Sequence, residues 1–210
     1  PVYGPFYAAI TESGRKIVAS PLERDEKGRY TLNLADAEGK LASREAKMVM
    51  MCSPHNPCGR AWSEEEIAGV AALCYKYGVP LACDEIHADF VFAPAKHHSV
   101  LDAPHAREFS VMLCAASKTY NVAGLQQSAI VCENGKMRER IQKEIVSCGV
   151  TSGNAFALAA TRAAYTDCDE WLDGLKAYLT DNRGLVTHYA AENFPKIVVT
   201  PMEATYLMWL

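Results

Sequence analysis

The sequence lacks any apolar run near the roughly 20 residues that a membrane-spanning helix needs; runs such as 155–160 and 197–199 are far shorter. It also lacks an excess of positive charge, because 21 Lys and Arg stand against 25 Asp and Glu, for a formal net charge of −4. No broad positive field is therefore expected for a phosphate backbone. These features predict neither a membrane nor a nucleic acid as partner. Since half of the 210 residues are hydrophobic, the composition also excludes a disordered chain.

Metal-binding and disulfide patterns are also missing, although the chain has eight cysteines. Most of these lie inside apolar runs, which is typical of small buried hydrophobic residues in a reducing compartment. This pattern predicts a cytoplasmic protein. Cys52, His55 and Cys58 form the most metal-like group, but a structural zinc site needs four ligands. No metal site is predicted.

Short β-rich runs alternate with segments of helical periodicity, a pattern typical of βα units and a parallel sheet. Ser63 and Glu66 form a capping box at the start of one helix, and Gly78 is typical of its end. We predict an α/β fold with a mostly parallel sheet and helices on both faces. The expected strands are 15–20, 47–52, 79–83, 109–114 and 128–132, and the expected helices are 63–77, 135–148, 155–165 and 171–193.

The pattern becomes β-rich again after Pro195, where 196–200 and 205–210 are predicted as strands. We therefore expect one domain over 1–193 and the beginning of a small α+β domain over 194–210. The chain opens at Pro1 without a Met and stops inside the apolar run TYLMWL. The expectation is a piece of a longer protein, with the first domain incomplete at its N-terminus.

Polar residues follow three of the predicted strands, and in open α/β sheets ligands bind beyond the carboxyl ends of the strands. These residues are Asn56, then Asp84 with His87, then Ser117 with Lys118. Each alone has an ordinary explanation, such as a turn residue, a cap, a core histidine or a surface lysine. Together they supply a lysine for a Schiff base, an aspartate for a pyridine nitrogen and donors for a phenolate oxygen. Those are the requirements of pyridoxal 5′-phosphate.

Four segments, in this order, carry a family resemblance: PVYGPFY, SPHNPCGR, DEIHADFVF and SKTYNVAGLQ. They resemble the large domain of the PLP-dependent fold-type I, class I/II aminotransferase family. Within that family the similarity is greatest to the cystathionine β-lyase-like C–S lyases, which include the maltose-regulon modulator type. The resemblance implies the aspartate aminotransferase fold and covers essentially the whole chain.

The resemblance implies roles for individual residues. Lys118 matches the Schiff-base lysine, which is also the catalytic residue, and Asp84 matches the partner of the pyridinium nitrogen. Asn56 matches the donor to the phenolic oxygen, and Tyr3 matches the ring that stacks on the cofactor; both are also expected at the substrate. His87 lies within DEIH, the form typical of the C–S lyase branch.

The phosphate site departs from the family pattern. Ala115 stands where many relatives carry a phosphate-binding Ser, and Gln126 stands where many carry Arg. Ser117 and Gln126 could contact the phosphate by hydrogen bonding, but neither supplies the charge of Arg. The family's Gly-rich phosphate-binding segment and its carboxylate-binding Arg have no counterpart in these 210 residues, so we expect the chain alone to lack full activity.

Two reactions fit these residues. A sulfur leaving group on Cβ would give α,β-elimination to a thiol, pyruvate and ammonia, which makes a C–S β-lyase the leading hypothesis. Without a leaving group, the same residues fit an aminotransferase acting on an L-amino acid and a 2-oxo acid. A regulator-binding protein and an α/β domain that binds no cofactor are further alternatives. Family members are generally homodimers, and 151–154 (TSGN) is a candidate phosphate or interface contact.

Overall fold

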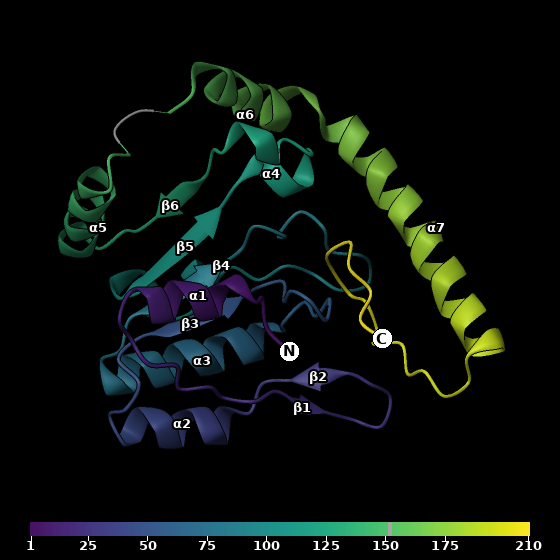
Figure 1. The fold of residues 1–210 in the computed structure, drawn as a ribbon, viewed down its shortest axis with the longest axis horizontal. Coiled ribbons are helices and arrows are strands. Elements are labelled where there is room, and N and C mark those ends of the chain that lie inside the picture. The colour runs from purple at the N-terminus through teal and green to yellow at the C-terminus, as the bar shows by residue number, and fades with distance from the viewer. Residues whose placement is uncertain (151–152) are drawn as a thin grey trace.

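A four-stranded sheet forms the centre of the protein (Figure 1). The computed structural model describes residues 1–150 and 153–210, so Thr151 and Ser152 of the predicted TSGN contact lie outside the described residues. The strands are β3 (Val49–Cys52), β4 (Leu81–Asp84), β5 (Ser110–Cys114) and β6 (Ala129–Val131), in the spatial order β3-β4-β5-β6. The first three are parallel and β6 is antiparallel to β5. The prediction of a mostly parallel sheet is confirmed.

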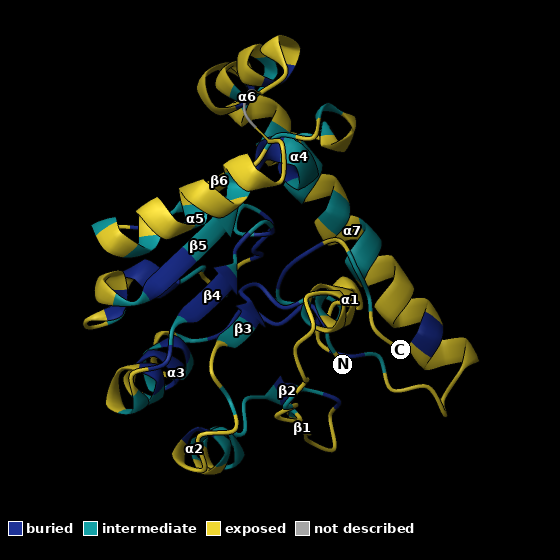
Figure 2. Ribbon diagram, turned by 60° about the vertical axis from the view of Figure 1, so that its left-hand side comes forward, coloured by how far each residue is buried: buried dark blue, intermediate teal, exposed yellow. Residues whose placement is uncertain are grey.

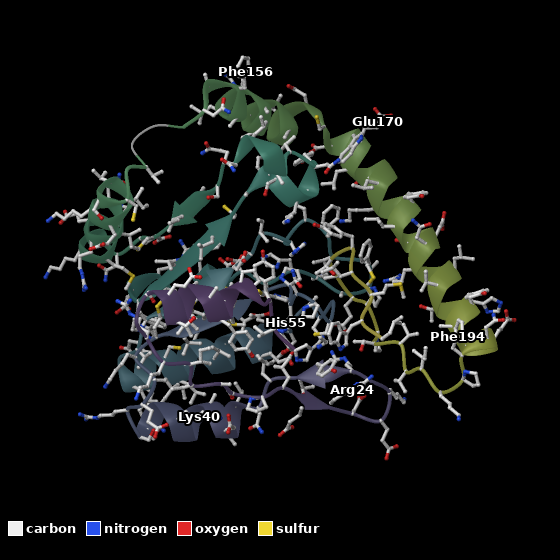
Figure 3. All side chains as sticks on the ribbon, viewed as in Figure 1. Arg24, Lys40, His55, Phe156, Glu170 and Phe194 are labelled. Atoms are coloured by element: carbon white, nitrogen blue, oxygen red, sulfur yellow. The ribbon has the colours of Figure 1, made fainter. Side chains whose placement is uncertain are left out.

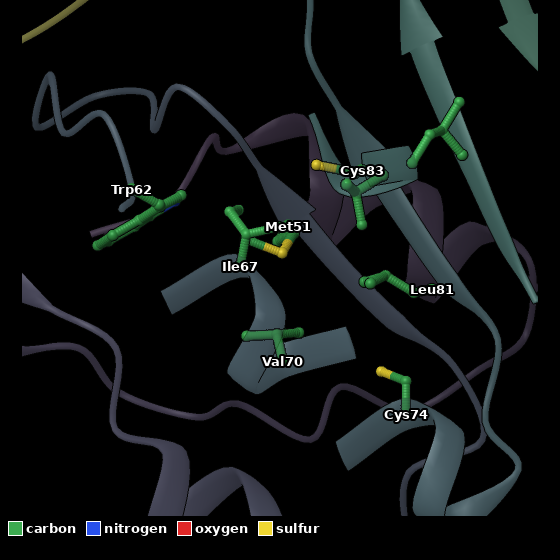
Figure 4. Close-up of a cluster of buried hydrophobic side chains, with 9 residues drawn as sticks. Met51, Trp62, Ile67, Val70, Cys74, Leu81 and Cys83 are labelled. Carbon is green, nitrogen blue, oxygen red and sulfur yellow. The ribbon is translucent and has the colours of Figure 1, made fainter. Parts of the chain in front are cut away.

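Helices cover both faces of this sheet. On one face α3 (Glu64–Tyr77) packs against Met51, Leu81 and Cys83 (Figure 4). On the other face, Ala82 and Val111 form a second cluster together with side chains of α5 (Gly135–Ser147). Successive strand residues point to opposite faces, which explains why β3 and β4 are apolar at nearly every position. Figure 2 shows β4 largely buried between these layers, whereas β5 is buried at its start and half-buried towards its end.

The helix α3 begins and ends where its sequence signals predict. The Ser63 hydroxyl accepts a hydrogen bond from the Glu66 backbone N–H, and the Glu66 carboxylate accepts one from the Ser63 N–H. Gly78 ends the helix in the left-handed region, at φ 64°, which glycine adopts without steric cost. The predicted helices after residue 150 also form, as α6 (Ala155–Asp167) and α7 (Asp169–Asn193).

The prediction of a strand over 15–20 is wrong. These residues form irregular chain between α1 (Pro5–Glu12) and β1 (Glu23–Arg24), which pairs antiparallel with β2 (Tyr30–Thr31). A strand requires a neighbour for its backbone hydrogen bonds, and in this structure no described strand pairs with 15–20. The helices α1 and α2 (Leu34–Ala42) were not predicted; α1 spans only eight residues and buries none of them fully, although Phe6 and Ile10 are partly buried.

The two strands predicted after Pro195 do not form either. Residues 196–210 are irregular chain, linked to the rest of the protein by a β-bridge between Val91 and Ala204, by backbone hydrogen bonds and by side-chain contacts such as the ion pair of Glu203 with Arg60. The 25-residue helix α7 carries the chain to this segment, past the side of the sheet (Figure 1).

Four short helices complete the described elements: α4 (Ala116–Thr119) and the 3-10 turns η1 (Val100–Asp102), η2 (Ala106–Glu108) and η3 (Ala123–Leu125). Among residues 1–150 and 153–210, no helix combines the length and apolar character needed to cross a membrane.

Candidate active site

The predicted site residues follow the carboxyl ends of the three parallel strands. Because β3, β4 and β5 run in the same direction, their carboxyl ends meet at one edge of the sheet. The register places Asp84, the last residue of β4, between Cys52 of β3 and Leu113 of β5. Asn56 lies in the turn after β3, and Lys118 lies in α4 immediately after β5. The fold therefore gathers three sequence-distant segments at one place, as a ligand site in an open α/β sheet requires.

Asp84 is a half-buried carboxylate at the centre of this edge. Its Oδ1 accepts a hydrogen bond from the Ile86 N–H at 3.1 Å, within the turn that follows β4. Burial raises the pKa of Asp84, and the neighbouring charge of Glu85 raises it further, while the Ile86 hydrogen bond and the charge of Lys118 act in the opposite direction. A cation placed beside this carboxylate would favour its ionised form.

His87 is buried one turn further on, and its Nδ1 has no hydrogen-bond partner among the described residues. Burial, followed by the charge of Lys118, lowers the pKa of His87 to about 4. The ring is thus neutral at pH 7 and offers one N–H donor and one acceptor. It packs edge-on against Tyr206, with the ring centroids 5.4 Å apart. Because buried polar atoms are normally hydrogen-bonded, the His87 ring retains the capacity to bond to a ligand.

Lys118 and Ser117 are half-buried in the short helix α4. The hydroxyl of the next residue, Thr119, is buried and donates a hydrogen bond to Asp89 Oδ2 at 2.7 Å. This contact ties α4 to the loop after β4. The charge of Lys118 acts on the pKa of both Asp84 and His87, so the structure brings these three predicted residues together.

The turn 53–60 after β3 holds Asn56, which is half-buried. The backbone closes this turn through two hydrogen bonds, from His55 N–H to the Arg60 carbonyl at 2.7 Å and from Gly59 N–H to the His55 carbonyl at 2.9 Å. His55 is buried in the interior (Figure 3), where its Nε2 lies 2.8 Å from the Pro1 carbonyl oxygen. This contact brings the start of the chain to the turn. The role of Asn56 remains a prediction.

Tyr3 lies two residues after Pro1, whose carbonyl contacts His55. The residue is 36% exposed, and its ring packs edge-on against Phe6, with the centroids 5.8 Å apart. The contact of Pro1 with His55 places the N-terminal segment near the Asn56 turn. Stacking of Tyr3 on a cofactor remains a prediction.

Glu85 is an important residue that the sequence did not reveal. It is buried at 2% exposure, and its carboxylate accepts hydrogen bonds from the Ser99 hydroxyl at 3.1 Å and the Val100 N–H at 2.7 Å. His97 Nε2 lies 2.8 Å from its other oxygen. Asp84 and His87 lie in the turn after β4, and Glu85 attaches this turn to residues 97–100 at the start of η1. Its only sequence signal is that it directly follows Asp84.

Three cysteines near the site are buried, as expected for small hydrophobic residues. Cys52, Cys58 and Cys83 are buried with free thiols, and burial raises the pKa of Cys52 to about 12. In the described part of the chain, no group of three or more His, Cys, Asp and Glu side chains is placed to hold a metal ion.

The site and fold define a class of α/β proteins that present a lysine, an aspartate and an asparagine at the carboxyl edge of a mostly parallel sheet. The aminotransferase class I and II family matches residues 1–210, and the chain belongs to that family. The predicted family and its aspartate aminotransferase-type fold are confirmed.

Relatives within this family include C–S lyases. The chain is 36% identical to "Cystathionine beta-lyase PatB" of Bacillus subtilis (strain 168) over 212 residues, which cover all of this chain and 54% of the relative. It is 32% identical to "Protein MalY" of Escherichia coli (strain K12), covering all of this chain and 53% of that protein. The crystal structure of the PLP-bound C–S lyase from Staphylococcus hominis superposes with a TM-score of 0.93 at 31% identity, over all of this chain and 52% of that structure. The chain spans about half the length of these relatives.

Proposed function

We propose that this chain carries the cofactor site of a PLP-dependent C–S β-lyase. The enzyme would act on a sulfur-containing L-amino acid and release a thiol, pyruvate and ammonia. The observation that carries the proposal is the grouping of Asp84, His87 and Lys118 at the carboxyl edge of the sheet, in the fold shared with a PLP-bound C–S lyase. The names of PatB and of the Staphylococcus hominis enzyme support the lyase reaction over the aminotransferase reaction.

The residues present fit pyridoxal phosphate. Asp84 offers a half-buried carboxylate to a ring nitrogen, and His87 offers a buried ring atom that lacks a partner among the described residues. Lys118 offers an amine, and Asn56 an amide donor for the phenolic oxygen. When bound, the cofactor supplies an electron sink for the charge that develops on the substrate Cα.

Each residue then has a defined task. A ring nitrogen that carries a proton would hold Asp84 in its ionised form, in opposition to the effect of burial, and Asp84 would keep the proton there. Lys118, as a neutral amine, would take the Cα proton of the substrate. Tyr3 would pack on the cofactor ring and limit access of water. Ser117 would donate a hydrogen bond to the phosphate.

The proposal also covers the location, the oligomeric state and the domain division of the protein. We place the active protein in the cytoplasm as a homodimer that binds an amino acid substrate, with free cysteines consistent with a reducing compartment. We divide the chain into the large domain over 1–193 and the beginning of a small domain over 194–210. We expect the 210-residue chain alone to lack full activity.

The test uses the product of the complete gene with pyridoxal phosphate and L-cystathionine, without a keto-acid acceptor. Sustained pyruvate release over many turnovers, abolished in Lys118→Ala, is expected for the lyase. Lys143→Ala, at an exposed position of α5, is the matched control and should retain activity. Turnover only after a 2-oxo acid is added would identify an aminotransferase instead, and no pyruvate under either condition would reject both.

A further inference from the structure

Arg60 is a charged residue with no exposure to solvent, and its guanidinium connects separate parts of the chain. Its Nε donates to the Tyr30 carbonyl of β2 at 2.6 Å, and its Nη2 donates to Glu66 of the α3 capping box at 2.6 Å. Its Nη1 donates to Glu203, from the C-terminal segment. Since a buried charge is tolerated only when it is paired and hydrogen-bonded, these partners fix the position of Arg60.

Glu203 has several further hydrogen-bond partners besides Arg60. Its Oε1 accepts from Arg29 Nε at 3.2 Å and its Oε2 accepts from the Ala61 N–H at 3.2 Å. The backbone N–H groups of Glu203 and Ala204 both donate to the Gly59 carbonyl, each at 2.8 Å. The segment around Glu203 is therefore attached directly to the turn 53–60, at the residues that precede and follow Arg60.

The same turn carries Asn56. The carbonyl of Arg60 accepts the hydrogen bond from His55 N–H that closes the turn at 2.7 Å, and His55 immediately precedes Asn56. A shift of Arg60 would therefore be transmitted through one hydrogen bond to the backbone that orients the Asn56 amide. A change of this kind matters because a hydrogen-bond donor must be placed within a few tenths of an ångström to act on its acceptor.

We propose that Glu203 is a positioning residue, which acts through buried Arg60 to hold the Asn56 turn so that the Asn56 amide faces the phenolic oxygen of the cofactor. This inference rests on the proposed function, because it assumes that Asn56 is that donor. Through this link Glu203, 143 residues after Arg60, influences the electronic state of the cofactor without touching it.

The test follows the visible absorbance of the bound cofactor against pH, in the holoenzyme made from the complete gene. A donor to the phenolic oxygen draws charge away from it and so lowers the pH midpoint of this titration. Asn56→Ala should therefore raise the midpoint. Glu203→Gln, which keeps the shape but loses the charge, should raise it by about half a pH unit. In the Asn56→Ala background, Glu203→Gln should add no further shift.

Glu133→Gln is the matched control, because it removes a surface ion pair with Arg107 and should leave the midpoint unchanged. A merely structural role for Glu203 would lower the unfolding temperature and leave the midpoint where it is, and that result would overturn the inference. An equal shift of the midpoint with and without Asn56 would also overturn it. Failure of the unmodified protein to develop a visible band with pyridoxal phosphate would reject the proposed function itself, which is a separate outcome.

Discussion

Replacement of Glu85 tests how the turn after β4 is held. The carboxylate accepts hydrogen bonds from the Ser99 hydroxyl at 3.1 Å and the Val100 N–H at 2.7 Å, and it pairs with His97 at 2.8 Å, all at 2% exposure of Glu85. Glu85→Ala leaves these groups without their acceptor. An unsatisfied buried group costs about 1–3 kcal/mol, and breaking a buried pair costs about 3–5 kcal/mol. We expect the free energy of unfolding to fall by about 3–5 kcal/mol.

Glu85→Gln separates shape from charge at the same position. The amide oxygen can still accept from Ser99 and Val100, and the amide nitrogen can donate to a neutral His97 ring, so the expected loss is only about 1 kcal/mol. The variant also removes the negative charge that raises the pKa of Asp84, so the pKa of Asp84 should fall. Urea unfolding at pH 7 measures the first effect, and NMR titration of the Asp84 carboxyl carbon measures the second.

An exposed glutamate provides the control. Glu108 also pairs with a histidine, His105 at 3.0 Å, but its side chain is 64% exposed. A surface pair of this kind contributes about 0–1 kcal/mol, so Glu108→Ala should change stability little. Equal losses for Glu85→Ala and Glu108→Ala would refute the reasoning, because burial would then have no effect on the cost. A Glu85→Gln variant as unstable as Glu85→Ala would show that charge, rather than hydrogen bonding, holds the turn.

Three further predictions concern His87, Gly59 and Trp62, which lie after the carboxyl ends of β3 and β4. Without cofactor, the free energy of unfolding should fall as the pH drops from 6.5 towards about 4, because over this range His87 stays neutral in the folded protein but takes up a proton in the unfolded chain. In urea unfolding at several pH values, His87→Gln should reduce this pH dependence. Gly59→Ala should lower the unfolding temperature more than Gly14→Ala, since both glycines have positive φ but only a Cβ at Gly59 would lie 2.9 Å from a backbone carbonyl. Trp62→Phe should cost about 1–2 kcal/mol in urea unfolding, because the buried indole N–H donates to the Cys52 carbonyl at 2.8 Å.

The sequence was sufficient for the elements that carry their own signals. β3 and β4 are apolar at nearly every position because both faces of the sheet are covered, and α3 has a capping box and a terminal glycine. The segment 15–20 depends on a partner strand instead. Its composition favours a strand, but a strand exists only where another strand pairs with it, and composition does not contain that information. The helix α1 shows the converse case, since it forms although none of its eight residues is fully buried.

The candidate site also contains residues that local sequence signals reveal and residues that they do not. The placement of Asn56, Asp84 and Lys118 at one edge of the sheet was predictable, because each lies at or shortly after the carboxyl end of a strand; their roles remain predictions. Arg60 and Glu85 were not, because their importance depends on partners far along the chain. Arg60 meets Glu203, and no local pattern predicts that pairing.

Asp84 and Glu85 are adjacent carboxylates, and their surroundings give them different roles. Glu85 accepts from two protein donors, a hydroxyl and a backbone N–H, and it also pairs with His97. Its oxygens are therefore engaged by the protein itself. Asp84 accepts one backbone N–H at 3.1 Å, and burial and the neighbouring Glu85 charge raise its pKa. Asp84 is destabilised in its charged form and can accept further hydrogen bonds, so it is suited to bind an external cation or N–H group. Glu85 has protein partners on both oxygens, so it is suited to hold the turn. Under the proposed function, two residues of the same chemistry therefore have different tasks, because their surroundings differ: Asp84 would bind the cofactor and Glu85 anchors the turn.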